Sequence, residues 1–195
     1  DMDRLARTLH GDELKVAFAF LLTMPGAPFI YYGDEIGLRY VENLVSVEGG
    51  YNRTGSRSPM QWNHSVNFGF SNASPEKLYI PTDDKPNSPT VEDQMADPAS
   101  LYYEVKKLIA LRRAHSALLS DGDIEFVSDG ADGAPLAYIR SSADEKILVI
   151  INPADKEAVL EVPGIWNESL YTVGGTVKAE NGKRIISPKS ANVLR

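Results

Sequence analysis

Cysteine is absent from this chain of 195 residues, and histidine occurs only three times. Without cysteine there is neither a disulfide framework nor thiolate chemistry, which fits a reducing compartment but does not exclude secretion; we expect a cytoplasmic location. The three histidines stand far apart and lack the spacing of metal ligands. The sequence therefore predicts no metal site and no cofactor.

Long apolar runs are also scarce. The longest, "LKVAFAFLLTMPGAPFIYYG", is interrupted by Pro25, Gly26 and Pro28, and its unbroken part is too short to cross about 30 Å of hydrocarbon. The formal net charge is −7, and the acidic residues are scattered along the chain. Nucleic acid and anionic membranes repel such a surface, so we expect neither as a partner and favour a neutral ligand.

The first third of the sequence predicts a helix followed by a strand. Residues 12–24, "DELKVAFAFLLTM", begin with two acids, which suit the positive end of a helix dipole, and are then apolar on nearly every side. A helix of this kind is buried or covered on several faces. After the Pro-Gly turn, "APFIYYG" has the pattern of a buried parallel strand.

Residues 34–97 show little periodicity but contain many aromatic side chains, which indicates a long ordered loop over a site. The next segment, "DPASLYYEVKKLIALRRAHSALL", predicts a helix with Asp97 as its cap and Pro98 in its first turn. Its basic pairs, at 106–107 and 112–113, are interpreted as a solvated face.

After residue 119 the sequence changes to short apolar runs separated by turn residues, among them "DIEFVS", "KILVIINP" and "SANVLR". Several short strands at close spacing are typical of an antiparallel β-sandwich. We therefore predict two domains, at residues 1–119 and 120–195.

Two stretches carry a resemblance to a known family. "LLTMPGAPFIYYGDEIG" resembles the entry to the eighth barrel strand of the α-amylase superfamily, and "GSRSPMQWN" resembles a segment of its α-glucosidase, oligo-1,6-glucosidase and trehalose synthase branch. The resemblance implies an α+β fold class. The expected fold is the C-terminal portion of a (β/α)8 TIM barrel, namely its last helix, strand, long loop and helix, followed by an all-β antiparallel sandwich.

The resemblance also suggests roles for the first residues. "DMDR" is similar to the latter half of a motif that ends the seventh strand in the family, which implies that Asp1 is the third catalytic carboxylate, stabilising the transition state, and that Arg4 is the arginine after it. A coincidental match remains open, since Asp3 is equally acidic. The nucleophile and the acid/base of the family come from the fourth and fifth strands, which precede anything present in this sequence.

"RTGSRSPMQW" follows the predicted strand, and the loops after strands ring the substrate in a barrel enzyme. By resemblance, Arg53 and Arg57 bind substrate beyond the cleaved bond. The alternative is that these arginines pair with loop acids such as Asp34, Glu35 or Glu48, with Trp62 in the core. Asp34 and Glu35 are themselves candidate substrate-binding residues at a strand end, although acids there also order loops.

These observations predict the C-terminal fragment of a retaining glycoside hydrolase that acts on an α-glucoside or oligosaccharide, inactive as an isolated chain. A trehalose-synthase-like isomerase, or a non-catalytic carbohydrate-binding or assembly role for 120–195, remains an alternative. The aromatics of the β module are few and scattered, which favours a structural role for it. An incomplete barrel is expected to need its missing portion or self-association.

Overall fold

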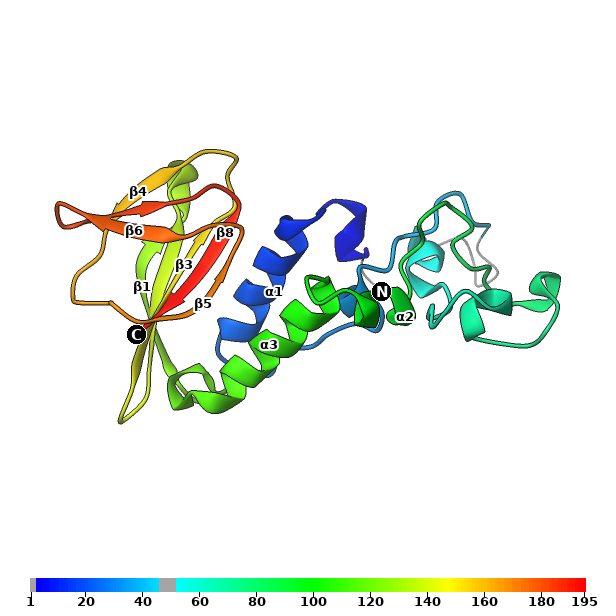
Figure 1. The fold of residues 1–195 in the computed structure, drawn as a ribbon, viewed down its shortest axis with the longest axis horizontal. Helices are drawn as coiled ribbons and strands as arrows, with labels where there is room; N and C mark the ends of the chain where they lie inside the picture. The colour runs from blue at the N-terminus through cyan, green and yellow to red at the C-terminus, as the bar shows by residue number, and fades with distance from the viewer. Residues whose placement is uncertain (1–2, 46–51) are drawn as a thin grey trace. The chain divides into compact units, whose positions relative to one another are not determined.

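The structure is a computed structural model that describes residues 3–45 and 52–195. The contacts within the chain divide it into two compact units. The loop unit comprises Asp1–His10 and Ile30–Glu104, and the sandwich unit comprises Gly11–Phe29 and Val105–Arg195 (Figure 1). The division differs from the predicted domains because the helix over residues 12–23 packs with the β module. The predicted domain boundary at 119/120 stays a prediction.

The sandwich unit contains the antiparallel β-sandwich that the short apolar runs predict. A five-stranded sheet has the order β1-β2-β3-β8-β5, and a three-stranded sheet has the order β4-β7-β6. Every pairing is antiparallel. The strands are β1 (Asp123–Asp129), β2 (Leu136–Ser141), β3 (Lys146–Asn152), β4 (Ala158–Glu161), β5 (Ser169–Val173), β6 (Val177–Glu180), β7 (Lys183–Ile186) and β8 (Ser190–Leu194).

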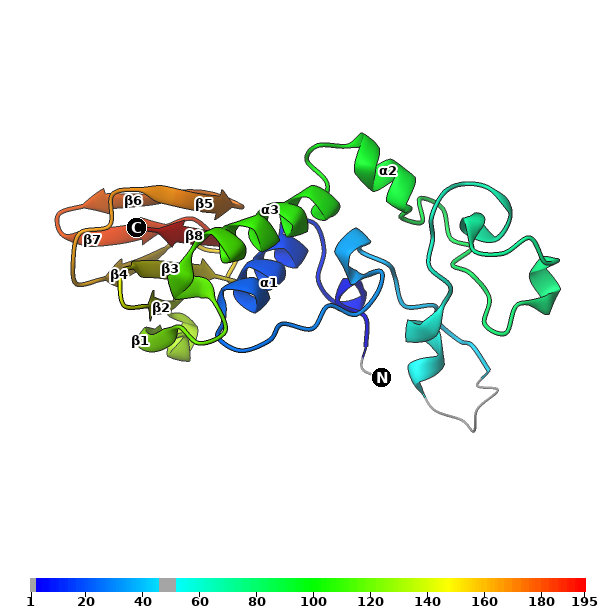
Figure 2. The same cartoon turned by 90° about the horizontal axis from the view of Figure 1, so that it is seen from below.

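Strand β3 is buried on both of its faces, which explains its unbroken apolar sequence "ILVII". Leu148 and Ile150 point into the core between the two sheets, where they join Ile186 of β7. Because successive side chains of a strand alternate, Ile147 and Val149 face the opposite way, toward helix α1 (Asp12–Thr23). The five-stranded sheet is thus covered by the second sheet on one face and by α1 on the other (Figure 2).

Helix α1 confirms the prediction for residues 12–24. Asp12 and Glu13 lie in its first turn, and buried side chains spread around much of its circumference. It packs against β8, β3 and β5 on one side, and α3 lies beside it (Figures 1 and 2). A helix that is apolar on nearly every side is accommodated because neighbours cover more than one of its faces.

Helix α3 (Leu101–Ala114) begins later than predicted. A shorter helix, α2 (Val91–Ala96), precedes it and is capped by Thr90, whose hydroxyl accepts a hydrogen bond from the Asp93 amide at 3.1 Å. Asp97 follows α2, and its Oδ1 accepts a hydrogen bond from the Ala99 amide at 2.9 Å, so it caps the turn that leads from Pro98 into α3. Helix α2 has its own start signal in Thr90 and Asp93, whose side chains bond to each other within its first turn.

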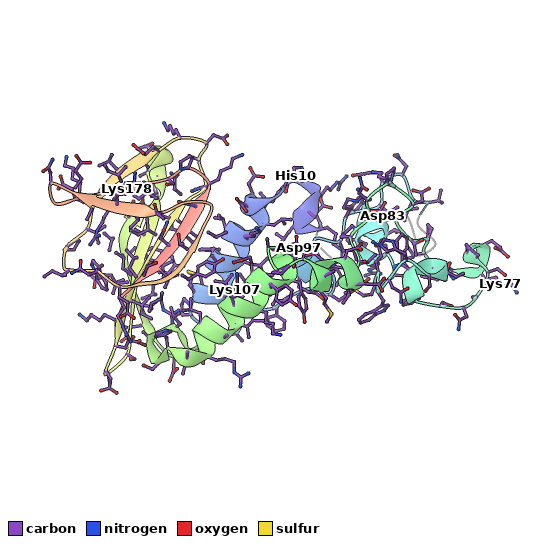
Figure 3. The ribbon with its side chains drawn as sticks, in the orientation of Figure 1. His10, Lys77, Asp83, Asp97, Lys107 and Lys178 are labelled. Atoms are coloured by element: carbon purple, nitrogen blue, oxygen red, sulfur yellow. The ribbon has the colours of Figure 1, made fainter. Side chains whose placement is uncertain are left out.

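The two basic pairs of α3 differ in environment. Lys106 and Lys107 are exposed, as predicted for a solvated face (Figure 3). The prediction is wrong for Arg112, which is buried and donates to the carbonyls of Leu22, Met24 and Gly26 at 2.8, 2.7 and 2.6 Å. The last carbonyls of a helix have no partner within the helix, and the Arg112 guanidinium donates hydrogen bonds to those at the end of α1.

The strand predicted at "APFIYYG" does not form within the described residues. Residues 27–31 form neither a strand nor a helix, and Phe29 is 89% exposed. A strand requires a neighbouring backbone for its hydrogen bonds, and the strands of the described chain pair among themselves in the two sheets. The prediction of a buried strand is therefore not confirmed for this segment.

The loop unit is built mainly from short 3-10 turns joined by irregular backbone, which agrees with the predicted long ordered loop. These turns are Leu5–Arg7, Asp34–Ile36, Asn52–Arg57, Val66–Gly69 and Pro75–Lys77. Over residues 3–45 and 52–195, no helix has the length and apolarity that a bilayer crossing requires.

Candidate active site

Arg4 occupies the centre of a compact cluster in the loop unit. Only 1% of its surface is exposed, and its guanidinium carbon lies 4.4 Å from the ring centre of Tyr31 and 4.7 Å from that of Tyr32. Its Nη1 donates to the carbonyl oxygen of Tyr32 and, at 3.1 Å, to Oδ1 of Asp34. The two tyrosines, predicted as members of a buried strand, instead hold a cation by their ring faces.

Asp34 is positioned by the glycine before it. Gly33 has a φ of +87°, and a Cβ at this position would lie 2.6 Å from a methyl carbon of Leu38, so the tight turn requires glycine. Burial raises the pKa of Asp34, while its hydrogen bond and charge interaction with Arg4 act to lower it. The structure thus brings together two of the predicted site residues, Arg4 and Asp34, as a buried ion pair.

Several buried polar atoms of the loop unit, two of them on Arg4, have no hydrogen-bond partner. They include Nε and Nη2 of Arg4, Oε2 of Glu35, Oγ of Ser58 and Oε1 of Gln61. All of them belong to the loop unit, and the described part of the sandwich unit contains none. Native interiors satisfy nearly all such groups, so their concentration in one unit marks the place where further polar contacts would be made.

The predicted arginines of "RTGSRSPMQW" lie on the turn Asn52–Arg57 and are partly exposed. The carbonyl of Arg53 accepts a hydrogen bond from the Ser56 hydroxyl at 2.7 Å. Arg57 lines a pocket of about 300 Å³ whose wall also includes Tyr32. Tyr32 therefore connects the Arg4 cluster with Arg57, although Asp34 pairs with Arg4 and not with the later arginines.

The Pro-Met-Gln-Trp segment is mainly structural. Gln61 is fully buried: its side-chain Nε2 donates to the carbonyl of Pro89 at 2.5 Å, and its backbone carbonyl accepts from the Val91 amide at 3.0 Å. Trp62, considered as a core residue, is 50% exposed. Its backbone, which bonds to Phe68 and Glu92, carries the structural role in place of its side chain.

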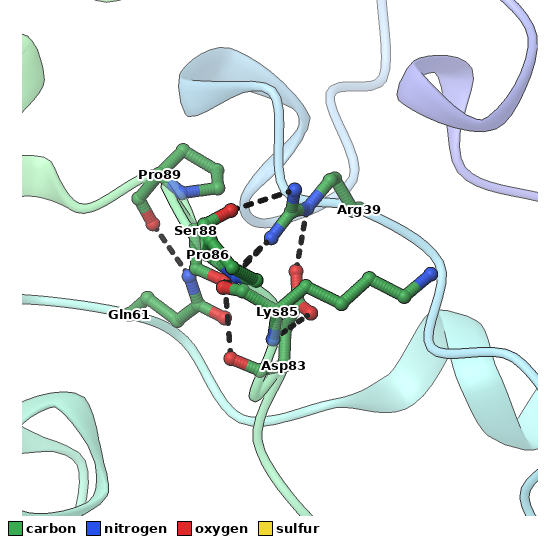
Figure 4. A network of polar contacts seen from close by, with 7 residues as sticks. All are labelled: Arg39, Gln61, Asp83, Lys85, Pro86, Ser88 and Pro89. Atoms are coloured by element: carbon green, nitrogen blue, oxygen red, sulfur yellow. Dashed lines mark hydrogen bonds and ion pairs between the residues drawn. The ribbon is translucent and has the colours of Figure 1, made fainter.

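A second polar network holds the loop that Gln61 contacts, and sequence reasoning missed it (Figure 4). Arg39 Nε donates to Oδ2 of the buried Asp83 at 2.6 Å, and Nη2 donates to the Ser88 hydroxyl at 2.6 Å. The other Asp83 oxygen accepts from the Lys85 amide at 3.1 Å. Arg39 and Asp83 are 44 positions apart, so nothing local in the sequence indicates the pair.

We expect Asp83→Asn to lower the free energy of unfolding of the loop unit by about 1.5–3 kcal/mol, the usual worth of a hydrogen bond to a charged group. The amide keeps the shape of the carboxylate but leaves Arg39 without its counter-charge. Denaturant unfolding followed by Trp62 fluorescence, in a Trp166→Phe background, measures the effect. The matched control is Asp84→Asn, because Asp84 is exposed. Equal losses in the two variants would contradict the role of the network.

Asp1, the predicted catalytic carboxylate, and Glu48, an alternative partner for the arginines, lie outside the described residues. Within the described ranges, no group of three or more His, Asp or Glu side chains could hold a metal ion. Arg4, Arg53, Arg57, Asp34 and Glu35 keep their predicted substrate roles as predictions.

Comparison with known proteins identifies the family of this chain. The family described as "Alpha amylase, catalytic domain" matches residues 1–122. A trehalose synthase of a Pimelobacter species is 36% identical over 159 residues, and a glucan 1,6-α-glucosidase of Streptococcus pneumoniae is 35% identical over 203 residues. These alignments cover 76% and 90% of this chain.

The crystal structure of the trehalulose synthase from Pseudomonas mesoacidophila has the same fold over 94% of this chain, with a TM-score of 0.77 at 22% identity. The chain spans 26% and 37% of the length of the two relatives and 38% of that solved chain. The family match covers more than half of the sequence. This chain therefore belongs to the α-amylase family.

Proposed function

We propose that this chain is the C-terminal part of a retaining glycoside hydrolase that acts on α-glucosides. The observation that carries the proposal is the Arg4 cluster, in which Arg4 is buried between two tyrosines and paired with Asp34, inside the segment that the family matches. The cluster orders the backbone three residues after Asp1, where the resemblance assigns a catalytic carboxylate. Relatives named as glucosidase and trehalose synthase support the substrate class.

The proposed chemistry requires carboxylates that this sequence does not supply. Retaining hydrolysis uses a nucleophile and an acid/base about 5–5.5 Å apart across the scissile bond. We assign Asp1 the third role, in which it accepts hydrogen bonds from sugar hydroxyls as the ring approaches its oxocarbenium-like transition state. The remaining two carboxylates belong to further residues of the protein or of a partner. Additional strands would join at segment 27–31, which pairs with no strand of the described chain.

The test compares the isolated 195-residue chain with the natural protein that contains this sequence, each assayed on maltose, isomaltose, trehalose and sucrose. The natural protein is expected to release or transfer glucose, and the isolated chain is expected to do neither. Turnover by the isolated chain would contradict the assignment of the nucleophile to other residues. Inactivity of the natural protein toward all four sugars would contradict the proposed reaction.

In the natural protein, Asp1→Asn is expected to lower kcat by about 100-fold or more, the usual effect of losing one preorganised transition-state contact. Asp3→Asn is the matched control, because Asp3 is exposed and contacts Arg7. A decrease confined to Asp3→Asn would move the catalytic role to that residue.

A trehalose-synthase-like isomerase is a second candidate, supported by the names of several relatives at 36% identity. Hydrolysis and isomerisation use the same carboxylates and differ in whether water or a sugar hydroxyl attacks the intermediate. The products from maltose distinguish them, since hydrolysis yields glucose and isomerisation yields trehalose.

A further inference from the structure

The loop unit contains another cavity, which the catalytic proposal does not use. Its volume is about 590 Å³, and pockets that bind small molecules usually span about 300–1,000 Å³. We call it the His64 pocket. The side chains that line it include His64, Phe68, Lys85, Asn87, Asp93 and Gln94. None of these residues has a role in the proposed catalysis, so a ligand bound here would be distinct from the substrate.

The hydrogen-bond acceptors of the pocket are largely engaged within the protein. Oδ1 and Oδ2 of Asp93 lie 3.0 and 2.8 Å from Nε2 of His64, and Oδ2 also accepts from the Thr90 hydroxyl at 2.8 Å. The bond from His64 lowers the pKa of Asp93, so this carboxylate stays ionised. Oε1 of Gln94 accepts from the Tyr102 amide at 3.2 Å. A ligand therefore meets few acceptors that could receive its own hydrogens.

Donors of the pocket, in contrast, are available. With the described residues of the chain, the Lys85 ammonium, Nε2 of Gln94 and Nδ1 of His64 make no hydrogen bond. The backbone of Lys85 is nevertheless fixed, because its amide donates to Asp83 Oδ1 at 3.1 Å and its carbonyl accepts from Ser88 Oγ at 2.8 Å. Its side chain extends away from these bonds (Figure 4). The pocket thus presents hydrogens to a ligand that is rich in acceptors.

Two residues of the lining are held in a strained backbone conformation. Phe68 has a φ of +54° and Asn87 has a φ of +55°, in the left-handed region that side chains other than glycine seldom adopt. The preceding Asn67 is buried and donates to the carbonyls of Ser71 and Ala73 at 2.8 and 2.7 Å, which holds the turn that presents Phe68. Strain that the surrounding structure maintains in this way is concentrated at sites that bind ligands.

The charge of the pocket depends on His64. Nε2 of its imidazole bonds to Asp93, and Nδ1 gains a hydrogen when the ring is protonated, which an unperturbed histidine does below about pH 6.5. The positive charges of His64 and Lys85 then outweigh the charge of Asp93. An oxyanion satisfies both this charge and the available donors. The other charged groups on these segments, or bonded to them, are Arg39 and Asp83, which pair at 2.6 Å, and the exposed Asp84 and Glu92.

The size of the pocket indicates a ligand larger than a bare anion. One water molecule takes up about 30 Å³ in the liquid, so an inorganic anion would leave most of the volume unfilled. Phe68 and Pro89 add apolar surface that an organic group would cover.

We propose that the His64 pocket binds the phosphate group of a small organic phosphate, with Lys85, Gln94 and protonated His64 as donors and the organic group against Phe68. The inference does not rest on the proposed function, because it uses neither the catalytic carboxylates nor an α-glucoside. The pocket is lined from residues 64–68 and from residues 85–94, so a bound phosphate would hold these two segments of the loop unit together.

The test is a titration of the purified 195-residue chain with phenyl phosphate and with inorganic phosphate near pH 6, followed by the NMR signals of the backbone amides. We expect phenyl phosphate to bind in the millimolar range and about threefold or more tightly than inorganic phosphate. Lys85→Met is expected to weaken it by about tenfold, since a hydrogen bond to a charged group is lost. Lys77→Met is the matched control, because Lys77 is an exposed lysine of the same unit outside the pocket lining.

Sulfate provides a second measurement, because its charge does not change between pH 6 and pH 8. Its binding is expected to be about threefold or more tighter near pH 6 than near pH 8, and His64→Gln should remove that difference. Circular dichroism verifies that each variant stays folded.

Absence of phosphate binding by the folded parent chain would overturn the proposal, as would equal weakening by Lys85→Met and Lys77→Met. Equal affinity for the two phosphates would overturn the assignment of an organic ligand, and sulfate binding that is independent of pH would overturn the role of His64. Displacement of phenyl phosphate by maltose would place it in a sugar site and contradict the His64 pocket. Turnover enters none of these measurements, so they fail or succeed separately from the proposed function.

Discussion

Arg140→Met is expected to lower the free energy of unfolding of the sandwich unit by about 3–5 kcal/mol, since each buried carbonyl that loses its donor costs about 1–3 kcal/mol. Arg140 is fully buried on β2, and it donates to the carbonyls of Thr23, Leu119, Gly122 and Asp123. Methionine fills much of the same space but removes the guanidinium donor from all four oxygens, of which Leu119 keeps the Gly122 amide at 3.3 Å. The loss is less than the sum of four bonds, because burial also disfavours the charge and lowers the pKa of Arg140.

The measurement is urea unfolding monitored by Trp166 in a Trp62→Phe background, so that the single tryptophan reports on the sandwich unit. Arg113→Met is the control, because Arg113 is an exposed arginine of the same unit. A loss below about 1 kcal/mol, or one equal to that of the control, would be typical of a surface substitution and would contradict a structural role for Arg140.

The large expected effect of replacing Arg140 has its cause at the C-terminal end of α1. No basic residue lies in the last turn of this helix, so its terminal carbonyls depend on donors from elsewhere. Arg140 reaches Thr23, Arg112 reaches Leu22 and Met24, and the Thr23 hydroxyl bonds to the Tyr138 hydroxyl at 2.6 Å. Burial raises the pKa of Tyr138 to about 12, so this hydroxyl remains protonated and able to donate.

The sequence correctly predicts the elements whose signal is local. Helix α1 and most strands of the sandwich follow from short apolar runs bounded by turn residues. Strand β6 is not predicted, because only Val177 is partly buried and its other residues are exposed, so no apolar run marks the strand. A local signal was nevertheless present, since Asn181 and Gly182 both have positive φ and form the tight turn between β6 and β7.

Contacts between residues far apart in the sequence are not predicted, because no local pattern indicates them. The periodicity of α3 does not indicate that Arg112 faces the end of α1 whereas Arg113 faces solvent. The ion pair of Arg39 with Asp83 joins segments with no common motif. For the same reason, the aromatic run at residues 29–32 was assigned to a strand core, and its role beside Arg4 emerges only when the turn at Gly33 is seen.

Arg4→Met is expected to lower the free energy of unfolding of the loop unit by about 3–5 kcal/mol at pH 7, the usual cost of removing one partner from a buried ion pair. Asp34, whose side chain is 10% exposed, would be left charged beside Glu35 with no counter-charge from Arg4. Trp62 fluorescence in the Trp166→Phe background follows the transition. The matched control is Arg7→Met, because Arg7 also pairs with acids and stacks on a tyrosine but is 35% exposed. A loss of at most about 1 kcal/mol is expected for that surface residue.

The pH dependence separates the charge of Asp34 from simple packing. Burial already raises the pKa of Asp34 in the folded state above its unfolded value of about 3.9, and losing Arg4 raises it further. A group whose folded pKa is raised loses stability as the pH rises past its unfolded pKa, and the variant loses more than the parent. The difference between Arg4→Met and the parent should therefore be largest near pH 7 and shrink toward pH 4. A difference that stays constant over this range would assign the whole effect to the lost contacts with Tyr31 and Tyr32, and the ion pair would then contribute nothing to the site.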